Sequence, residues 1–276
     1  MSNGPTIATT TAGAAAEKAL PRPQAVLFDV YDTLFHNPTD DWVSAFDAIC
    51  HDQRLPFSGH SLWSRWKPHE IKFRQVRTNL QDPAQSPPFK TYEQAWTECF
   101  EAVFREAGVA GDAALAGRRS VEHMARRPIF PDTRPALATL EGRARLGVLS
   151  NADDAFVRPL LAGERLQLEA IESSESARVY KPAPAAFQHV LRVMGIAASH
   201  AWYVGDQLFD DVLGAHRVGM TTVWINRPGN PFAGHGPRPA ATIADLRELG
   251  PLLDLAEVEV GRRRGQGVKR ADAQVR

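Results

Sequence analysis

Five short apolar runs, several of them separated by segments of helical pattern, constrain this 276-residue chain to an α/β fold. The runs are apolar along their whole length, which is typical of parallel strands buried on both faces of a sheet. Helical patterns at Pro184–Met194 and Asp210–Val218 separate the later runs, and this alternation predicts a doubly wound, Rossmann-like parallel sheet. The predicted strands are Ala25–Asp29, Leu146–Ser150, Ala170–Ser173, Ala201–Asp206 and Thr222–Asn226.

The first two predicted strands are separated by far more chain than one crossover connection needs. The intervening residues 39–126 are helical in pattern, with proline and glycine punctuation. An apolar stripe runs through Leu62, Trp66, Phe73 and Val76, and Pro68 is expected near a helix start, dividing the stripe between two helices. We therefore predict a core domain formed by residues 23–38 and 127–256, with an inserted α-helical cap domain at 39–126.

The two ends of the chain, residues 1–22 and 257–276, lack apolar periodicity and are predicted to be disordered tails, the second of them basic. The whole chain has 32 basic and 32 acidic residues, so its net charge gives no sign of a nucleic-acid or anionic membrane partner. No apolar run is long enough for a membrane helix, and residues 1–22 lack the pattern of a secretory signal.

Two cysteines, Cys50 and Cys99, fall in helical segments and are expected to be buried, reduced thiols rather than a disulfide. These features together predict a cytoplasmic protein, a monomer or homodimer, that contacts neither nucleic acid nor membrane.

Candidate catalytic or metal-binding residues end three of the predicted strands, where ligands bind in open α/β sheets. Asp29 ends the first strand, and an ionised aspartate there can attack phosphorus or carbon to form a covalent intermediate that water later opens. Ser150 and Asn151 end the second strand and can either hold an oxyanion or cap a helix. Lys181, followed by Pro182, is either a counter-charge for Asp29 or an ordinary surface lysine.

Acidic residues follow the fourth predicted strand. Gly205 permits a close backbone approach, and the spacing brings Asp206 and either Asp210 or Asp211 to the same side. Two carboxylates at ~4 Å repel by roughly 4 kcal/mol at an effective dielectric of about 20, so protons or a divalent cation must offset the repulsion. Oxygen ligands of this kind suit Mg²⁺. The alternative, that Asp210 and Asp211 only cap a helix, accounts for one of them but not for all three acids.

Taken in order, four segments resemble the motifs of the haloacid dehalogenase superfamily. They are Val26-Leu27-Phe28-Asp29-Val30-Tyr31-Asp32-Thr33-Leu34, Gly147-Val148-Leu149-Ser150-Asn151, Tyr180-Lys181-Pro182 and Tyr203-Val204-Gly205-Asp206-Gln207-Leu208-Phe209-Asp210-Asp211. The resemblance implies that Asp29 is the nucleophile and that Lys181 steadies the developing charge. It further implies that Thr33, with Ser150 or Asn151, binds the transferring group. The Mg²⁺ site would comprise Asp29, the backbone carbonyl of Tyr31, Asp206 and either Asp210 or Asp211.

One position departs from the commonest form of this pattern. Most phosphatases of the superfamily carry an aspartate, which protonates the leaving group, where this chain has Tyr31, and Asp32 stands where glycine is usual. Loss of a positioned acid typically costs about 10²–10⁴-fold in rate. Tyrosine here resembles the 2-haloacid dehalogenase branch, whose halide leaving group needs no acid. Trp66-Lys67 is similar to that branch's Trp-Arg pair, which implies that Lys67 binds the substrate carboxylate.

The fourth motif favours the other branch, because 2-haloacid dehalogenases have a Ser-Ser-Asn stretch there and use no metal. We therefore predict a Mg²⁺-dependent hydrolase whose small anionic substrate is a phosphate ester or acyl phosphate. A 2-haloacid dehalogenase-like hydrolase and a non-catalytic ligand-binding protein are the alternatives. A run of cap cations is expected to be a solvated helix face rather than an anion-steering surface; these are Arg65, Lys67, Lys72, Arg74 and Arg77.

Overall fold

A six-stranded sheet forms the centre of the molecule, in a computed structural model that describes residues 20–233 and 236–259. All neighbouring strands are parallel, in the order β3-β2-β1-β4-β5-β6. The predicted doubly wound fold and its five strands are confirmed. The sixth strand was not predicted, because it is three residues long and its central residue is exposed. The strands are β1 (Ala25–Phe28), β2 (Arg145–Ser150), β3 (Ala170–Ser173), β4 (Ala201–Gly205), β5 (Thr221–Ile225) and β6 (Ala241–Ile243).

The two central strands, β1 and β4, are completely buried. Their register aligns Phe28 with Val148 of β2 and with Val204 of β4. Because the strands are parallel and in this register, the residues that follow them meet at one edge of the sheet.

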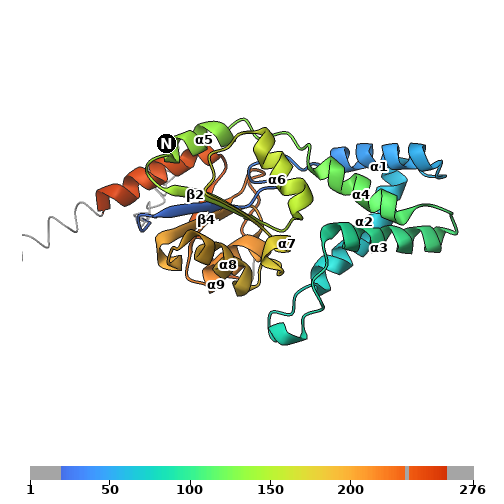
Figure 1. Cartoon of the computed structure of the whole chain (residues 1–276). Coiled ribbons are helices and arrows are strands. Elements are labelled where there is room, and N and C mark those ends of the chain that lie inside the picture. Colours follow the sequence, from blue (N-terminus) through green and yellow to red (C-terminus); the bar gives the residue numbers. More distant parts are fainter. Residues whose placement is uncertain (1–19, 234–235, 260–276) are drawn as a thin grey trace, which may run out of the picture.

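Helices cover both faces of the sheet (Figure 1). One face packs against α5 (Thr133–Leu140) and α6 (Asp154–Gly163), and the other against α8 (Pro184–Met194) and α9 (Gly214–Arg217). The remaining core elements are the helix at 249–259 and the short segments α7 (Ser174–Ala177), η2 (Ala198–His200), η3 (Leu208–Leu213) and η4 (Leu246–Glu248).

The chain between β1 and β2 folds into a separate helical layer, which we call the cap (Figure 1). Its centre is a cluster of packed aromatic rings, in which Trp42 and Trp66 stack with ring centroids 5.5 Å apart and Phe46 packs edge-on against Trp66. The cap elements are α1 (Thr39–Gln53), α2 (Gly59–Val76), η1 (Pro83–Gln85), α3 (Tyr92–Ala107) and α4 (Ala113–Met124).

Helix α2 corrects one expectation, because it runs without interruption through Pro68. A proline inside a helix removes one backbone donor, but Leu62 and Trp66 are buried on the face that packs against α1 and α3. This packing keeps the helix continuous. Val76, placed on the buried stripe by the sequence, is 55% exposed.

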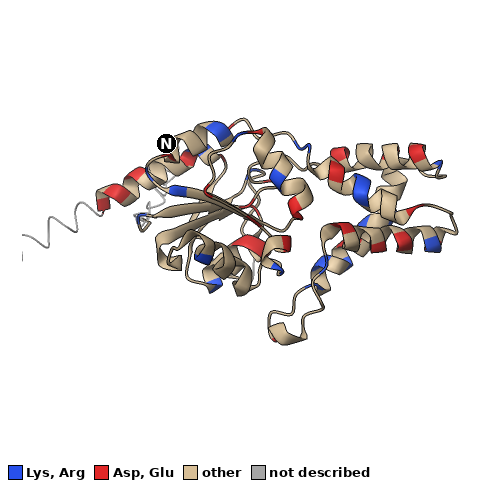
Figure 2. Cartoon of the chain, in the orientation of Figure 1, with Lys and Arg blue, Asp and Glu red and all other residues tan. Residues whose placement is uncertain are grey.

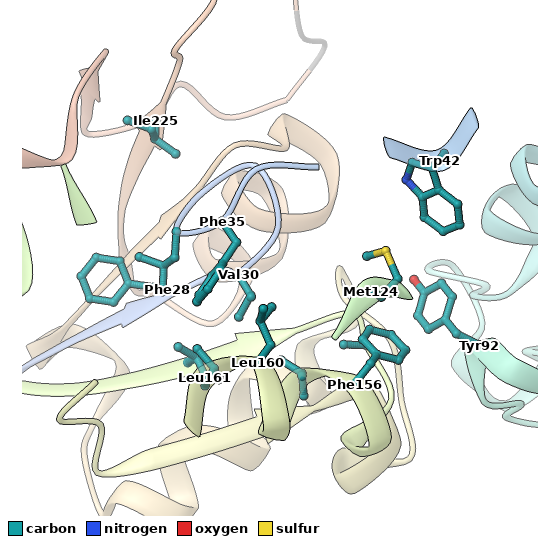
Figure 3. Close-up of a cluster of buried hydrophobic side chains, with 14 of the residues drawn as sticks. Phe28, Val30, Phe35, Trp42, Tyr92, Met124, Phe156, Leu160, Leu161 and Ile225 are labelled. Carbon is teal, nitrogen blue, oxygen red and sulfur yellow. The ribbon is translucent and has the colours of Figure 1, made fainter. Parts of the chain in front are cut away.

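An apolar cluster joins the cap to the core (Figure 3). Phe156 of α6 lies beside Met124 and Tyr92 of the cap, while Phe28 and Phe35 continue the cluster into the core. The ring of Phe156 also stacks on Trp96 of α3, with centroids 5.9 Å apart. The cap therefore packs over the carboxyl edge of the sheet.

The chain ends differ in part from the expected tails. Leu20 is buried and the carbonyl of Pro21 accepts a hydrogen bond of 2.8 Å from Trp202, so residues 20–22 pack on the core. Residues 257–259 continue the last helix. The rest of both predicted tails, 1–19 and 260–276, lies outside the described residues.

Three other expectations concern the described residues. Cys50 and Cys99 are buried free thiols, as predicted, and burial raises their pKa values to about 11 and about 12. Basic and acidic residues are interspersed over both core and cap (Figure 2). Within the described part of the chain, no helix has the length and apolar character needed to cross a membrane.

Candidate active site

Asp29, directly after β1, is buried at the carboxyl edge of the sheet, with 7% of its surface exposed. Its Oδ1 accepts hydrogen bonds from Ser150 Oγ at 2.9 Å and from Lys181 Nζ at 2.6 Å. Its backbone N–H donates to the carbonyl of Val204 at 2.9 Å, which continues the ladder to β4. The carboxylate is therefore held in one orientation by a hydroxyl and an ammonium group.

The ammonium of Lys181 is completely enclosed and has a partner for each of its three protons. It lies 2.6 Å from Oδ1 of Asp29, 2.6 Å from Oδ1 of Asp211 and 2.9 Å from the hydroxyl of Tyr203. Burial alone would lower the pKa of Lys181, but the carboxylates of Asp211 and Asp29 outweigh it and raise the pKa well above its ordinary value. Lys181 thus stays charged, and the surface-lysine alternative is wrong.

Tyr203 was missed by sequence reasoning because it sits inside the apolar run of β4. Its hydroxyl donates to the carbonyl of Leu149 at 2.7 Å and accepts from Lys181. The signal in the sequence was a hydroxyl-bearing side chain within an otherwise apolar strand.

The turn after β4 decides which of two adjacent aspartates faces Asp29. Segment η3 is a π-helical turn, in which the N–H of Val212 donates to the carbonyl of Gln207 at 3.2 Å. The extra residue of this wider turn brings Asp211, rather than Asp210, under the end of β4. A Cβ at Gly205 would collide with the Asp211 carboxylate, which explains why glycine occupies that position.

Three carboxylates gather at this edge: oxygens of Asp29, Asp206 and Asp211 all lie within 4.8 Å of one another. Burial, reinforced by the neighbouring carboxylates, raises the pKa of Asp206 well above its ordinary value; burial also raises that of Asp211, to about 7. A cluster of this kind must hold a proton or a cation. Its hard oxygen donors fit Mg²⁺, and the carbonyl of Tyr31 remains a predicted further ligand.

Asp210 lies outside this cluster and faces the cap. Its Oδ2 accepts from Arg77 at 2.9 Å and from Asn151 at 3.2 Å. Of the two alternatives for the third carboxylate, the geometry therefore favours Asp211.

Arg77, at the end of α2, is buried between cap and core. Its guanidinium donates to the hydroxyl of Tyr92 at 2.5 Å as well as to Asp210. The expectation that the cap cations form a solvated face is therefore wrong for Arg77. Its partner is 133 positions away along the chain, so no local pattern could reveal it.

Ser150 and Asn151 have different roles in the structure. Ser150 contacts Asp29, whereas Asn151 binds the backbone of Lys181, donating to its carbonyl at 3.1 Å and accepting from its N–H at 2.8 Å. Thr33 contacts a different carboxylate of the cluster, because its hydroxyl is 3.5 Å from Oδ1 of Asp206. The structure thus brings Asp29, Ser150, Lys181, Asp206 and Asp211 together, with Thr33 beside Asp206, whereas Asp210 contacts the site through Asn151.

Tyr31 and Asp32 line the same cavity as Asp29, but their side chains form hydrogen bonds elsewhere. The Tyr31 hydroxyl donates to the carbonyl of Met124 at 3.3 Å, and burial raises the pKa of the phenol well above its ordinary value. Asp32 adopts a left-handed conformation (φ 61°), which aspartate tolerates better than most residues, and its carboxylate accepts from the N–H of Asn37 at 3.0 Å. This backbone conformation accounts for a position usually held by glycine.

A cavity of about 140 Å³ lies between the acidic cluster and the cap. Lys67 lines it, but its ammonium pairs with the buried carboxylate of Glu70 at 2.8 Å and lies 5.0 Å from the ring centroid of Trp63. Aromatic side chains form much of the remaining wall; they are Trp42, Trp66, Tyr92, Trp96 and Phe156. The cavity can accept a small molecule with an anionic end.

Several known proteins resemble this chain in sequence or in fold. Residues 23–219 match the family model described as haloacid dehalogenase-like hydrolase. Haloacetate dehalogenase H-2 of a Moraxella species is 27% identical, over 83% of this chain and 97% of its own length. Phosphoserine phosphatase of Thermus thermophilus is 33% identical, over 56% of this chain and 66% of its own. The structure of a magnesium-bound hydrolase from Bacillus subtilis superposes with a TM-score of 0.68 at 22% identity, covering 84% of this chain and 99% of that one.

Proposed function

Because this chain belongs to the haloacid dehalogenase-like hydrolases, we propose that it is a Mg²⁺-dependent hydrolase of a small phosphate ester or acyl phosphate. The observation that carries the proposal is the carboxylate of Asp206 beside Asp29 and Asp211. When all three carboxylates are ionised, they and the one ammonium of Lys181 leave two negative charges, which a divalent cation would balance. Asp29, Asp206 and Asp211 would hold the ion.

The side chains around Asp29 support attack on phosphorus. Ser150 and Lys181 both bind Oδ1 of Asp29, which leaves the other carboxylate oxygen available as the nucleophile. The phosphoryl group then passes to Asp29, and water later releases it as phosphate. When bound, Mg²⁺ would offset the negative charge on the phosphoryl oxygens while the phosphoryl group transfers.

Tyr31, which occupies the position of the usual acid, does not donate a proton to the leaving group. The Tyr31 hydroxyl is committed to the carbonyl of Met124, and its raised pKa opposes proton loss. We therefore propose that good substrates carry leaving groups that depart without protonation, such as aryl or acyl phosphates.

A second candidate function is metal-independent hydrolysis of a carbon–halogen bond. It is favoured by Tyr31, by the small cavity, and by the similarity to haloacetate dehalogenase H-2 along nearly the whole of that protein. The trio of Asp29, Lys181 and Asp211 would serve this reaction, and Asp206 would then have no part in it.

One assay separates the two functions. Phosphate release from acetyl phosphate and 4-nitrophenyl phosphate, and halide release from 2-chloropropionate, are each measured with Mg²⁺ and with EDTA. The proposal predicts phosphate release that disappears in EDTA. Halide release that is indifferent to EDTA would contradict it and support the second candidate.

The variant Asp29→Asn is the control for contaminating activities. It should lose turnover of either kind of substrate, so full activity in that variant would contradict both functions. Ligand binding without turnover over the whole panel would instead indicate a non-catalytic binding protein.

A further inference from the structure

Arg74, on α2 three residues before Arg77, lines the cavity without a carboxylate at hydrogen-bonding distance among the described residues. Its guanidinium lies 3.8 Å from Glu70 and 3.9 Å from Asp210, and it makes no hydrogen bond within the described residues. Its side chain is 41% exposed and lines the cavity above the acidic cluster. A guanidinium so placed has free donors in a planar fork that matches carboxylates and phosphates.

The two carboxylates nearest Arg74 are paired with other cations. Glu70 is paired with Lys67 at 2.8 Å, and Asp210 is paired with Arg77 at 2.9 Å. These three cap cations face two carboxylates, and both carboxylates already have a closer partner than Arg74. Among these three cations, Arg74 is therefore the one that no carboxylate binds at hydrogen-bonding distance.

Arg74 also marks the boundary between two hollows. Together with Gln207 and Asp210, it lines both the cavity and an adjoining groove of about 350 Å³ between α2 and η3. The groove exposes apolar surface from both sides, with Ile71 of the cap 43% and Phe209 of the core 58% exposed. A molecule that extends from the acidic cluster toward solvent along this route passes the guanidinium.

We propose that Arg74 binds a second oxyanion, carried by the leaving group of the substrate. The substrate class is then a phosphorylated compound with a further carboxylate or phosphate group. This inference rests on the proposed function, which places the transferring phosphoryl group at Asp29.

Direct binding of non-hydrolysable phosphonates tests the inference without turnover. Titration calorimetry in the presence of Mg²⁺ compares propylphosphonate with 3-phosphonopropionate and with propane-1,3-diylbisphosphonate, each against wild type and Arg74→Gln. The matched control is Lys72→Gln, which removes the same charge from an exposed position of α2 that lines neither hollow. Arg74→Lys reports how much of the effect needs the guanidinium fork.

Wild type should bind at least one of the doubly anionic ligands more tightly than propylphosphonate, and the better of the two identifies the second group. Arg74→Gln should lose about ten- to a hundredfold in affinity for that ligand, with little change for propylphosphonate. Lys72→Gln should change neither, and Arg74→Lys should recover part of the loss.

Two negative outcomes are distinguishable. Equal binding of the three ligands by wild type, or an equal loss for all of them in Arg74→Gln, would overturn the inference while leaving the proposed function standing. No binding of any phosphonate in Mg²⁺ would contradict the proposed function, and the inference with it.

Discussion

The ammonium of Lys181 lies 2.6 Å from the carboxylate of Asp29, and both groups are buried beneath the cap. At neutral pH, below the ordinary pKa of lysine, the ammonium is charged in both the folded and the unfolded chain, so this interaction contributes fully to stability. The pair therefore has a structural role in addition to the catalytic role proposed for it.

Replacing Lys181 by methionine should abolish turnover and destabilise the fold. The substitution leaves Asp29 and Asp211 buried without their cation, which costs about 3–5 kcal/mol. Urea unfolding at neutral pH in EDTA measures this loss, with Lys72→Met as the exposed control. Unchanged stability would show that the carboxylates take up protons at no cost to folding.

The contact between Arg77 and Asp210 should couple the cap to the core. Because both side chains are buried, Arg77→Met is expected to lower the free energy of unfolding by about 3–5 kcal/mol. Asp210→Asn and the double variant complete a cycle, in which the double variant should cost less than the sum of the singles by about 1–3 kcal/mol. Strict additivity would mean that the ion pair contributes nothing of its own.

Residues whose partners lie nearby in sequence, or whose role follows from a strand end, were predictable. Asp29, Ser150 and Asp206 end buried apolar runs, so their meeting at one sheet edge followed from parallel topology. Asp211 could not be separated from Asp210, because the choice depends on one extra residue in a π-helical turn. The burial of Arg77 was equally hidden, since its partners come from η3 and α3. Helix α2 passes through Pro68 because of tertiary packing that no local propensity records.

Tyr31→Asp should restore a proton donor for poor leaving groups. An aspartate at this position would raise kcat for an alkyl phosphate by up to about 10²-fold, while changing kcat for 4-nitrophenyl phosphate much less. The ratio of the two kcat values is the measurement. A ratio that does not move would indicate that the Tyr31 position does not face the leaving group.

Asp153 should give the fold a distinct dependence on pH. Its buried carboxylate accepts from the N–H groups of Tyr92 and Glu93, at 2.7 and 2.9 Å, and so holds the start of α3 on the core. Burial raises its pKa from 3.8 to about 6, partly opposed by these two hydrogen bonds, with Glu175 and Glu93 adding to the rise. Between those values the folded chain binds a proton that the unfolded chain has released, so the contribution of Asp153 to stability falls as pH rises.

The variant Asp153→Asn isolates this titration. The unfolding free energy of wild type minus that of the variant should fall by about 2 kcal/mol as pH rises from about 4 to about 6. Urea unfolding of both proteins across that interval gives the difference directly, since all other acids are common to both. A difference that is constant or that grows with pH would show that Asp153 is not protonated in the folded state.

The central claim, that Asp206 makes this a Mg²⁺-dependent phosphohydrolase, is tested most directly by phosphate release from acetyl phosphate. Initial rates are measured against Mg²⁺ concentration for wild type and for Asp206→Asn, which keeps the shape of the side chain and removes its charge. The account predicts saturable activation of wild type by Mg²⁺ and a loss of at least about 10²-fold in the variant at any concentration. Equal rates for the two proteins, or a wild-type rate independent of Mg²⁺, would contradict it.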